Sequence, residues 1–171
     1  CGLYLVSYDR KTYVYEKGFV PDFLEDFKKS AIGLHFRLEQ EMGWVPNCIL
    51  ENKTSFYTDI DPKKISNPIN ARAIEIQKIQ TVLNIPIKVG EEIIGAFSLS
   101  SHSKPIYLSQ DDIESIKRFV NQIAVVLRNS KLYDELKAKN IEIENLNKIS
   151  KQISMSLDFD IVFEQIVEYL K

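Results

Sequence analysis

Few side chains in this sequence have the reactivity that catalysis or metal binding requires. The chain of 171 residues contains two cysteines, Cys1 and Cys48, and two histidines, His35 and His102, and all four are far apart in the sequence. A catalytic thiol needs a base or a second thiol close by, and a zinc site needs several Cys, His or carboxylate ligands at close spacing. We therefore expect no catalytic residue, no metal site and no bound cofactor in this chain.

Phosphate binding by a glycine-rich loop is also excluded. The six glycines are dispersed, and the sequence contains neither the G-x-G-x-x-G pattern of dinucleotide-binding sites nor a P-loop. Two cysteines permit a single disulfide bridge, but so low a cysteine content is more typical of two free thiols in a reducing compartment. We accordingly expect a cytoplasmic protein.

The charge balance excludes two further classes of partner. Lys and Arg number 22 against 24 Asp and Glu, so the net charge is −2. Proteins that bind nucleic acid usually carry a basic surplus, and a membrane anchor often uses a polybasic segment. The apolar run at residues 123–127 is among the longest, and it is far shorter than the roughly 20 residues that cross a bilayer. We expect no nucleic-acid partner and no direct membrane insertion.

Hydrophobic periodicity and turn residues predict the elements that would position a site. Alternation of apolar and polar residues indicates strands, and apolar residues at three- and four-residue spacing indicate helices. Strands are predicted at residues 2–9, 12–19, 32–38, 54–58, 80–89 and 92–101, and helices at 23–30, 39–50 and 71–79. The first two strands form a hairpin, and residues 63–70 form a loop in which Pro68 ends any helix.

The strands at residues 80–89 and 92–101 each present two different faces, because every second residue of a strand points to the same side. One face of the first strand carries Thr81, Leu83, Ile85 and Ile87. One face of the second carries Ile93, Gly95, Phe97 and Leu99, and its other face carries Ile94, Ala96, Ser98 and Ser100. The small side chains of this last set leave room for a helix or a ligand to pack closely.

A long helix follows these strands. Ser109 is positioned to cap it, and Asp112 stands where a capping box places its acidic residue. A heptad pattern then indicates a coiled coil. Its dimer seam is predicted at Leu132, Leu136, Ile143, Leu146, Ile153 and Leu157. Residues 156–160 interrupt the pattern, and we expect a separate helix after them.

Five segments resemble those of a GAF domain. They are T-V-L-N-I-P-I at residues 81–87, G-E-E-I-I-G-A-F-S-L at 90–99, P-I-Y-L-S-Q-D-D at 105–112, N-Q-I-A-V-V-L-R-N-S-K-L-Y-D-E-L at 121–136 and G-W-V at 43–45. Each motif is short, and their common order and spacing across residues 1–135 make the resemblance specific.

The resemblance implies an α+β fold, with an antiparallel sheet that has helices on both faces, followed by a long C-terminal signalling helix. It divides the chain into a GAF-like sensor domain at residues 1–128, a coiled-coil linker helix at 129–157 and a truncated entrance helix of a following domain at 158–171. The family's first helix would precede Cys1. We therefore expect a fragment of a multidomain signalling protein, either a tandem-GAF sensor or a GAF domain joined to an output domain.

GAF domains usually hold a small-molecule pocket on one face of the sheet. The candidate lining residues are Phe36, Trp44, Tyr57, Asp59, Thr81 and Phe97, with Asp59 as the main polar contact. The alternative is that these aromatic residues only fill the core. The tyrosines of the first two strands, Tyr4, Tyr8, Tyr13 and Tyr15, are expected to pack within the sheet.

The ligands and activities known in the family match this sequence poorly. Cyclic-nucleotide-binding GAF domains carry Asn-Lys where residues 101–102 read Ser-His, although residues 107–112 resemble the end of that signature. Bilin attachment uses a Cys beside a His, and Cys48 has no such neighbour. Haem ligation would rest on a lone histidine, and the reduction of methionine sulfoxide would need paired cysteines.

We expect a regulatory module that senses a small molecule, forms a homodimer and transmits a conformational change through its C-terminal helix to an effector. The effector would be a cyclase, a histidine kinase or a diguanylate cyclase, and none of their catalytic motifs occurs in this chain. The alternatives are a structural dimerisation domain without a ligand and a cyclic-nucleotide-binding GAF domain.

Overall fold

The computed structural model describes residues 1–169, without the side chains of Lys131, residues 155–160, Val162 and Gln165. The chain forms two compact units, Cys1–Arg128 and Asn129–Lys171. No helix among the described residues is long and apolar enough to span a membrane.

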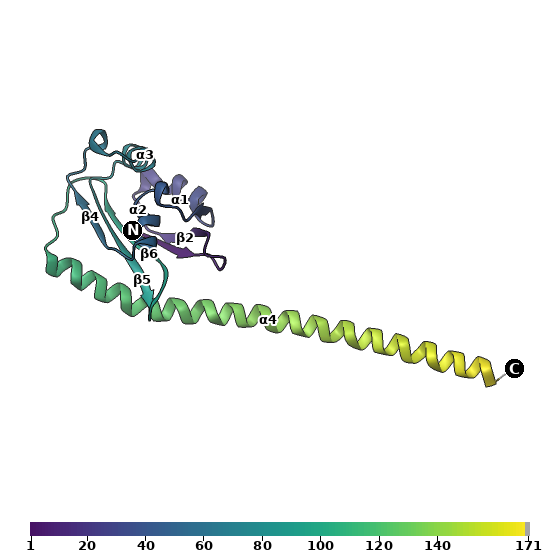
Figure 1. Ribbon diagram of the computed structural model, residues 1–171. Coiled ribbons are helices and arrows are strands. Elements are labelled where there is room, and N and C mark those ends of the chain that lie inside the picture. The colour runs from purple at the N-terminus through teal and green to yellow at the C-terminus, as the bar shows by residue number, and fades with distance from the viewer. Residues whose placement is uncertain (170–171) are drawn as a thin grey trace. The chain divides into compact units, whose positions relative to one another are not determined.

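One six-stranded antiparallel sheet forms the centre of the first unit (Figure 1). Its strand order is β3-β2-β1-β6-β5-β4. The strands are β1 Gly2–Val6, β2 Thr12–Gly18, β3 His35–Arg37, β4 Ser55–Thr58, β5 Thr81–Val89 and β6 Glu92–Ser101. Two hairpins, β1-β2 and β5-β6, are joined by the pairing of β1 with β6, in which Tyr4 faces Ala96. The predicted α+β fold with an antiparallel sheet is confirmed.

Helices cover both faces of this sheet (Figure 1). On one face lie α1 Glu25–Ala31, α2 Trp44–Leu50 and α3 Pro68–Gln77, together with three 3-10 turns at Asp22–Leu24, Gln40–Met42 and Pro62–Lys64. Cys48 and Ile49 of α2 pack against Val6, Tyr13 and Ala96 of the sheet. On the other face, Ile113, Val120 and Ala124 of α4 Gln110–Tyr169 pack against Leu83, Ile85 and Ile87 of β5.

Two helix boundaries differ from the sequence prediction. The helix predicted at residues 39–50 is divided at Gly43, whose φ of 111° lies in the left-handed region that favours glycine. Pro68 begins α3 instead of ending a helix, because a proline at the first helical position removes only an N–H that has no helical partner. The Asn67 side chain caps this helix by accepting hydrogen bonds from the backbone N–H groups of Ile69 and Asn70.

A β-bulge in β6 reverses the faces predicted for two of its residues. Ile87 of β5 pairs with Gly95 and the next residue, Lys88, pairs with Ile93, so Ile94 is the extra residue. Ile94 therefore packs with the α4 cluster and Ile93 with the α2 cluster, opposite to the strict alternation. Beyond the bulge the predicted faces hold, with Phe97 and Leu99 toward α4.

The long helix α4 begins as predicted. Ser109 Oγ accepts from the Asp112 N–H over 3.2 Å, and Asp112 Oδ2 accepts from the Ser109 N–H over 2.9 Å, so the two residues form a reciprocal capping box. The helix then continues for 60 residues without the interruption predicted at 156–160. No glycine or proline occurs within it, and an aspartate in a helix interior costs only about 0.7 kcal/mol or less.

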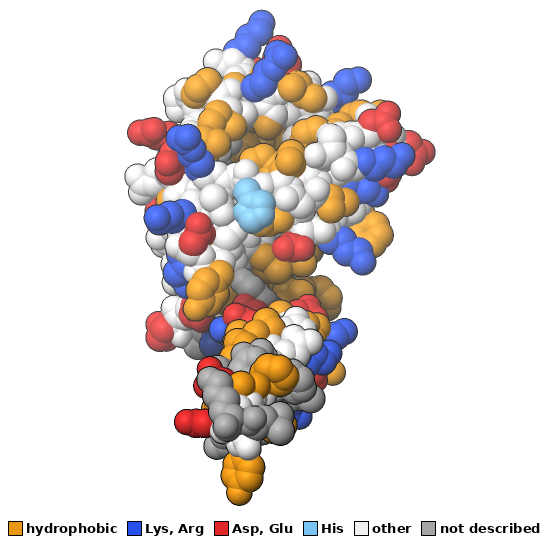
Figure 2. All heavy atoms as spheres, turned by 90° about the vertical axis from the view of Figure 1, so that its right-hand side faces the viewer, with side chains coloured by type: hydrophobic (Ala, Val, Ile, Leu, Met, Phe, Trp, Pro, Cys, Tyr) orange, Lys and Arg blue, Asp and Glu red, His pale blue; other side chains and the backbone are white. Residues whose placement is uncertain are grey.

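The second unit consists of the α4 segment after Arg128. Figure 2 shows hydrophobic side chains on the surface of this helix. The predicted seam residues Leu132, Leu136, Ile143, Leu146 and Ile153 are each about half exposed or more, and the side chain of Leu157 lies outside the described residues.

Candidate ligand cavity

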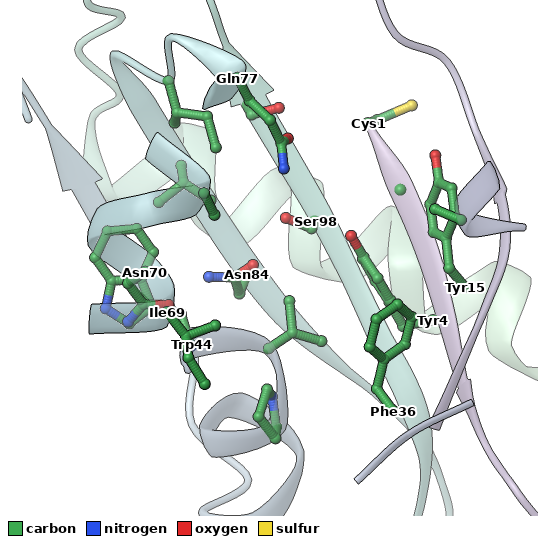
Figure 3. Close-up of a pocket in the computed structure, with 18 of the residues that line it drawn as sticks. Cys1, Tyr4, Tyr15, Phe36, Trp44, Ile69, Asn70, Gln77, Asn84 and Ser98 are labelled. Atoms are coloured by element: carbon green, nitrogen blue, oxygen red, sulfur yellow. The ribbon is translucent and has the colours of Figure 1, made fainter. Parts of the chain in front are cut away.

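A cavity of about 230 Å³ lies between the sheet and helices α1, α2 and α3 (Figure 3). Strands β1, β2, β5 and β6 contribute its floor, and the three helices and their loops contribute its walls. Its volume is somewhat below the roughly 300–1,000 Å³ of a site for a drug-sized molecule. Among the residues that line it there is no Asp, Glu, Lys or Arg.

One wall is built on Trp44, the first residue of α2. Its backbone N–H donates to Asn70 Oδ1 over 3.1 Å, which ties the start of α2 to α3. Its indole stacks on Tyr57 of β4, with ring centroids 4.6 Å apart and an interplanar angle of 16°. Because Tyr57 covers one face of the indole, the ring is held in place while it borders the cavity.

The opposite wall is a group of tyrosines from the β1-β2 hairpin. Tyr4 and Tyr15 are paired across the two strands, with ring centroids 5.1 Å apart, and Tyr13 stacks on Phe36 at 5.4 Å. Burial raises the pKa of Tyr4, raises that of Tyr13 to about 12 and also raises that of Tyr15. These three rings pack within the sheet as predicted, whereas Tyr8 is 90% exposed in the turn after β1. The three rings also line the cavity, which the sequence pattern did not indicate.

Asn84 of β5 supplies a buried amide on the cavity floor. Its side chain is 1% exposed, and its Nδ2 donates to Ser55 Oγ over 3.2 Å. Within the described residues, Asn84 Oδ1 has no hydrogen-bond partner. An unpartnered buried acceptor costs about 1–3 kcal/mol. The sequence indicates this position, because Asn84 interrupts the apolar residues of the segment T-V-L-N-I-P-I.

His102 closes the cavity next to α3. Its Nδ1 lies 2.7 Å from the Gln77 carbonyl oxygen, and its Nε2 lies 3.0 Å from Ser100 Oγ. The tautomer with a proton on Nδ1 donates to the carbonyl and accepts from the hydroxyl. Both ring nitrogens are therefore engaged in hydrogen bonds within the protein. His35 lies on β3 against the hydroxyls of Ser7 and Thr12.

The six pocket residues predicted from sequence occupy three different places. Phe36 and Trp44 line the cavity, and Tyr57 supports Trp44 from behind. Asp59 is exposed in the turn after β4, where its φ is 53°. Thr81 and Phe97 lie on the opposite face of the sheet: Thr81 Oγ1 is 3.0 Å from Thr58 Oγ1, and Phe97 packs into the α4 cluster.

The two cysteines are free thiols in different surroundings. Cys48 is buried in α2, and burial raises the pKa of its thiol to about 12, so it stays protonated at neutral pH. Cys1 borders the cavity. No group of three or more His, Cys, Asp or Glu side chains that could hold a metal ion occurs in the described part of the chain.

Residues 1–128 match the sequence model of the GAF domain. The chain belongs to the GAF domain family. Solved GAF domains share its fold. That of an Acinetobacter phosphoenolpyruvate-protein phosphotransferase aligns with a TM-score of 0.59 at 14% identity, over 79% of this chain and 73% of the other. That of a Bacillus halodurans two-component sensor histidine kinase aligns with a TM-score of 0.56 at 19% identity, over 78% and 83% of the two chains.

An enzyme shares the GAF fold as well. The type II free methionine-R-sulfoxide reductase of Thermoplasma acidophilum aligns with a TM-score of 0.51 at 17% identity, over 75% of this chain and 77% of the other. Identities this low show a common fold and nothing finer. A comparison with curated proteins finds no match.

Proposed function

We propose that this GAF domain is a sensory module of a cytoplasmic signalling protein. It binds a small molecule in the cavity and alters the packing of α4, which forms a homodimer and acts on an effector domain outside this sequence. The proposal treats the domain as non-catalytic, and the protonated thiol of Cys48 and the engaged nitrogens of His102 support that reading.

The observation that carries this proposal is the two-sided role of β5. Asn84 faces the cavity, and its neighbours Leu83 and Ile85 pack against α4 on the other face of the sheet. All three side chains are at most 1% exposed, so none moves without displacing what it touches. A ligand that shifts Asn84 would therefore displace the surface on which α4 rests.

Strand β6 provides a second connection of the same kind. Ser98 and Ser100 border the cavity, and Phe97 and Leu99 pack toward α4. Because β5 and β6 are paired along their whole length, the two strands would shift together. Ligand binding at one face of the hairpin is thus converted into a change at the other.

Dimerisation through α4 would allow an effector domain to respond to such a change. The seam residues whose side chains are described are large, apolar and about half exposed, and full burial of such a side chain contributes about 1.5–3 kcal/mol. Half of that gain is available at each position when two helices pair. A parallel arrangement suits a linker, because it presents both copies of the next domain in the same direction.

A ligand-free structural domain is the main alternative. That function is best served by a core filled with side chains, and a cavity of about 230 Å³ that borders an unpartnered Asn84 Oδ1 favours the sensor.

The test fills the cavity by substitution and measures the dissociation constant of the dimer. Ser98→Phe places a ring in the cavity, and Ser103→Phe adds the same ring at an exposed loop as the matched control. Sensing predicts that Ser98→Phe changes the dimer dissociation constant by about fivefold or more, the lower end of typical allosteric coupling, and that the control does not. Equal dissociation constants for a folded Ser98→Phe and the wild type, by analytical ultracentrifugation, would show that cavity and helix are not coupled.

A further inference from the structure

The unpartnered oxygen of Asn84 indicates what a ligand must offer. Nδ2 is held by Ser55 Oγ, which directs Oδ1 away from β4. Figure 3 shows this oxygen facing the space between Trp44 and Tyr4. A buried amide oxygen that accepts no hydrogen bond gains most from a ligand that donates one.

The polar groups around this oxygen are neutral. Ser98 is paired with Asn84 across the β5-β6 hairpin, and the hydroxyl of Tyr4 is directed into the same space (Figure 3). The amide of Gln77 lies at the α3 end of the cavity. These groups offer hydrogen bonds but no full charge.

The walls are aromatic on two sides. The indole of Trp44 borders the cavity from α2, and the rings of Tyr4 and Phe36 border it from the β1-β3 side (Figure 3). Both walls are supported from behind, Trp44 by Tyr57 and Phe36 by Tyr13. Ring stacking adds to the gain from simple burial, so a flat molecule makes the most favourable contacts with these walls.

The lining groups that can carry a charge are already engaged: the Cys1 ammonium donates to the Phe19 carbonyl oxygen, and both nitrogens of His102 are hydrogen-bonded. No Lys, Arg, Asp or Glu lines the cavity, and burial raises the pKa of the tyrosines that do. Burying an unpaired charge at such a site is strongly unfavourable. The same argument disfavours phosphate-bearing ligands, including cyclic nucleotides.

We infer that the cavity takes an uncharged, planar molecule that donates a hydrogen bond to Asn84 Oδ1. This inference rests on the proposed sensory function and specifies the ligand class of the same site. The ligand lies between Trp44 and the Tyr4–Phe36 wall, with its N–H or O–H directed at the cavity floor.

Three small probes of nearly the same shape separate these requirements. Benzamide is neutral and donates an N–H, methyl benzoate is neutral and donates nothing, and benzoate is charged and donates nothing. Trp44 is the only tryptophan of the chain, so its fluorescence and its indole N–H resonance both report on the cavity. We expect benzamide to bind at least about tenfold more tightly than either other probe, the equivalent of one good hydrogen bond.

The variant Asn84→Leu tests the role of the amide with a side chain of similar size. It should lower the affinity for benzamide about tenfold and leave methyl benzoate unchanged, while Ser55→Ala, which keeps Oδ1, should retain benzamide binding. Should the variant not fold, the ranking of the three probes on the wild type decides the question alone.

The possible failures are distinct. If benzoate binds as tightly as benzamide, the ligand need not be uncharged. If methyl benzoate binds as tightly as benzamide, the ligand need not donate a hydrogen bond. In both cases the cavity still binds a ligand. The absence of any response at Trp44 overturns the ligand class, while the sensory function is decided separately by the effect of Ser98→Phe on the dimer dissociation constant. If benzamide binds as expected and the dimer is unaffected, the sensory function fails and the ligand class stands.

Discussion

Arg128 Nη1 donates a hydrogen bond to Glu92 Oε2 over 2.9 Å, and this ion pair holds the end of the GAF unit to the beginning of a central strand of its sheet. Glu92 is the first residue of β6, and its second oxygen accepts from Arg10 in the β1-β2 turn over 3.0 Å. The carboxylate thus connects both hairpins to the point at which α4 leaves the domain.

We predict that Glu92→Gln weakens the coupling between cavity and dimer more than it weakens the fold. The side chains of the triad are between 38% and 54% exposed, so their loss should cost only about 0.5–1 kcal/mol of unfolding free energy. Urea denaturation measures that change, and ultracentrifugation measures whether Ser98→Phe still alters the dimer. Glu91→Gln is the matched control, because Glu91 is almost fully exposed and pairs with Lys88. A response to Ser98→Phe that survives Glu92→Gln would assign the coupling to the β5-α4 packing alone.

Asn84→Leu should raise the unfolding free energy of the domain by about 1 kcal/mol in the absence of ligand. The substitution removes an acceptor that has no partner and fills the same buried position with apolar atoms. Thermal or urea unfolding measures the change. Ser55→Ala provides the comparison, because it removes the one hydrogen bond that Asn84 makes and should destabilise the domain. A loss of stability in Asn84→Leu larger than that in Ser55→Ala, which removes the same hydrogen bond, would mean that Oδ1 is satisfied in the folded protein.

The unfolding free energy should decrease as the pH rises from about 9 toward 12. Burial raises the pKa of Cys48 from 9.0 to about 12 and that of Tyr13 from 10.0 to about 12. The unfolded chain therefore loses these protons at a lower pH than the folded protein does, and ionisation favours unfolding by up to about 1.4 kcal/mol per pH unit for each group. Urea titrations at intervals of pH measure this slope. Tyr13→Phe should reduce it above pH 10, and an identical slope in that variant would contradict the assignment.

The sequence was informative wherever local chemistry decides the structure. The Ser109–Asp112 capping box and the alternation of β5 depend on neighbouring residues, and both formed as predicted. The bulge at Ile94 depends on how the residues of β6 pair with those of β5, and the sequence of one strand alone does not predict this pairing. Tyr4 borders the cavity because β1 pairs with both β2 and β6. The pairing of β1 with β6 joins residues that are far apart in the sequence, so local patterns do not predict it. Thr81 and Phe97 lie on the sheet face opposite this cavity, and the sequence alone does not indicate which face a cavity occupies.

The composition of the seam leads to the last prediction, that the double substitution Ile143→Asp and Leu146→Asp converts a homodimer into a monomer. Both residues are more than half exposed on α4, at adjacent core positions of the heptad pattern. Two carboxylates in each helix would meet two from the partner, and burying them unpaired costs more than the apolar contacts they replace.

The GAF fold should survive this change, because the first unit has its own hydrophobic core around Leu83, Val120 and Ala124. Circular dichroism and the fluorescence of Trp44 measure whether the domain remains folded. Ile141→Asp is the matched control: Ile141 is equally exposed, at 52%, but lies outside the seam positions. Ultracentrifugation at about 100 μM should show a dimer for the wild type and for this control, since dimer populations depend on protomer concentration. A monomeric wild type at that concentration, or a dimer that withstands the double substitution, would exclude this seam as the dimer interface.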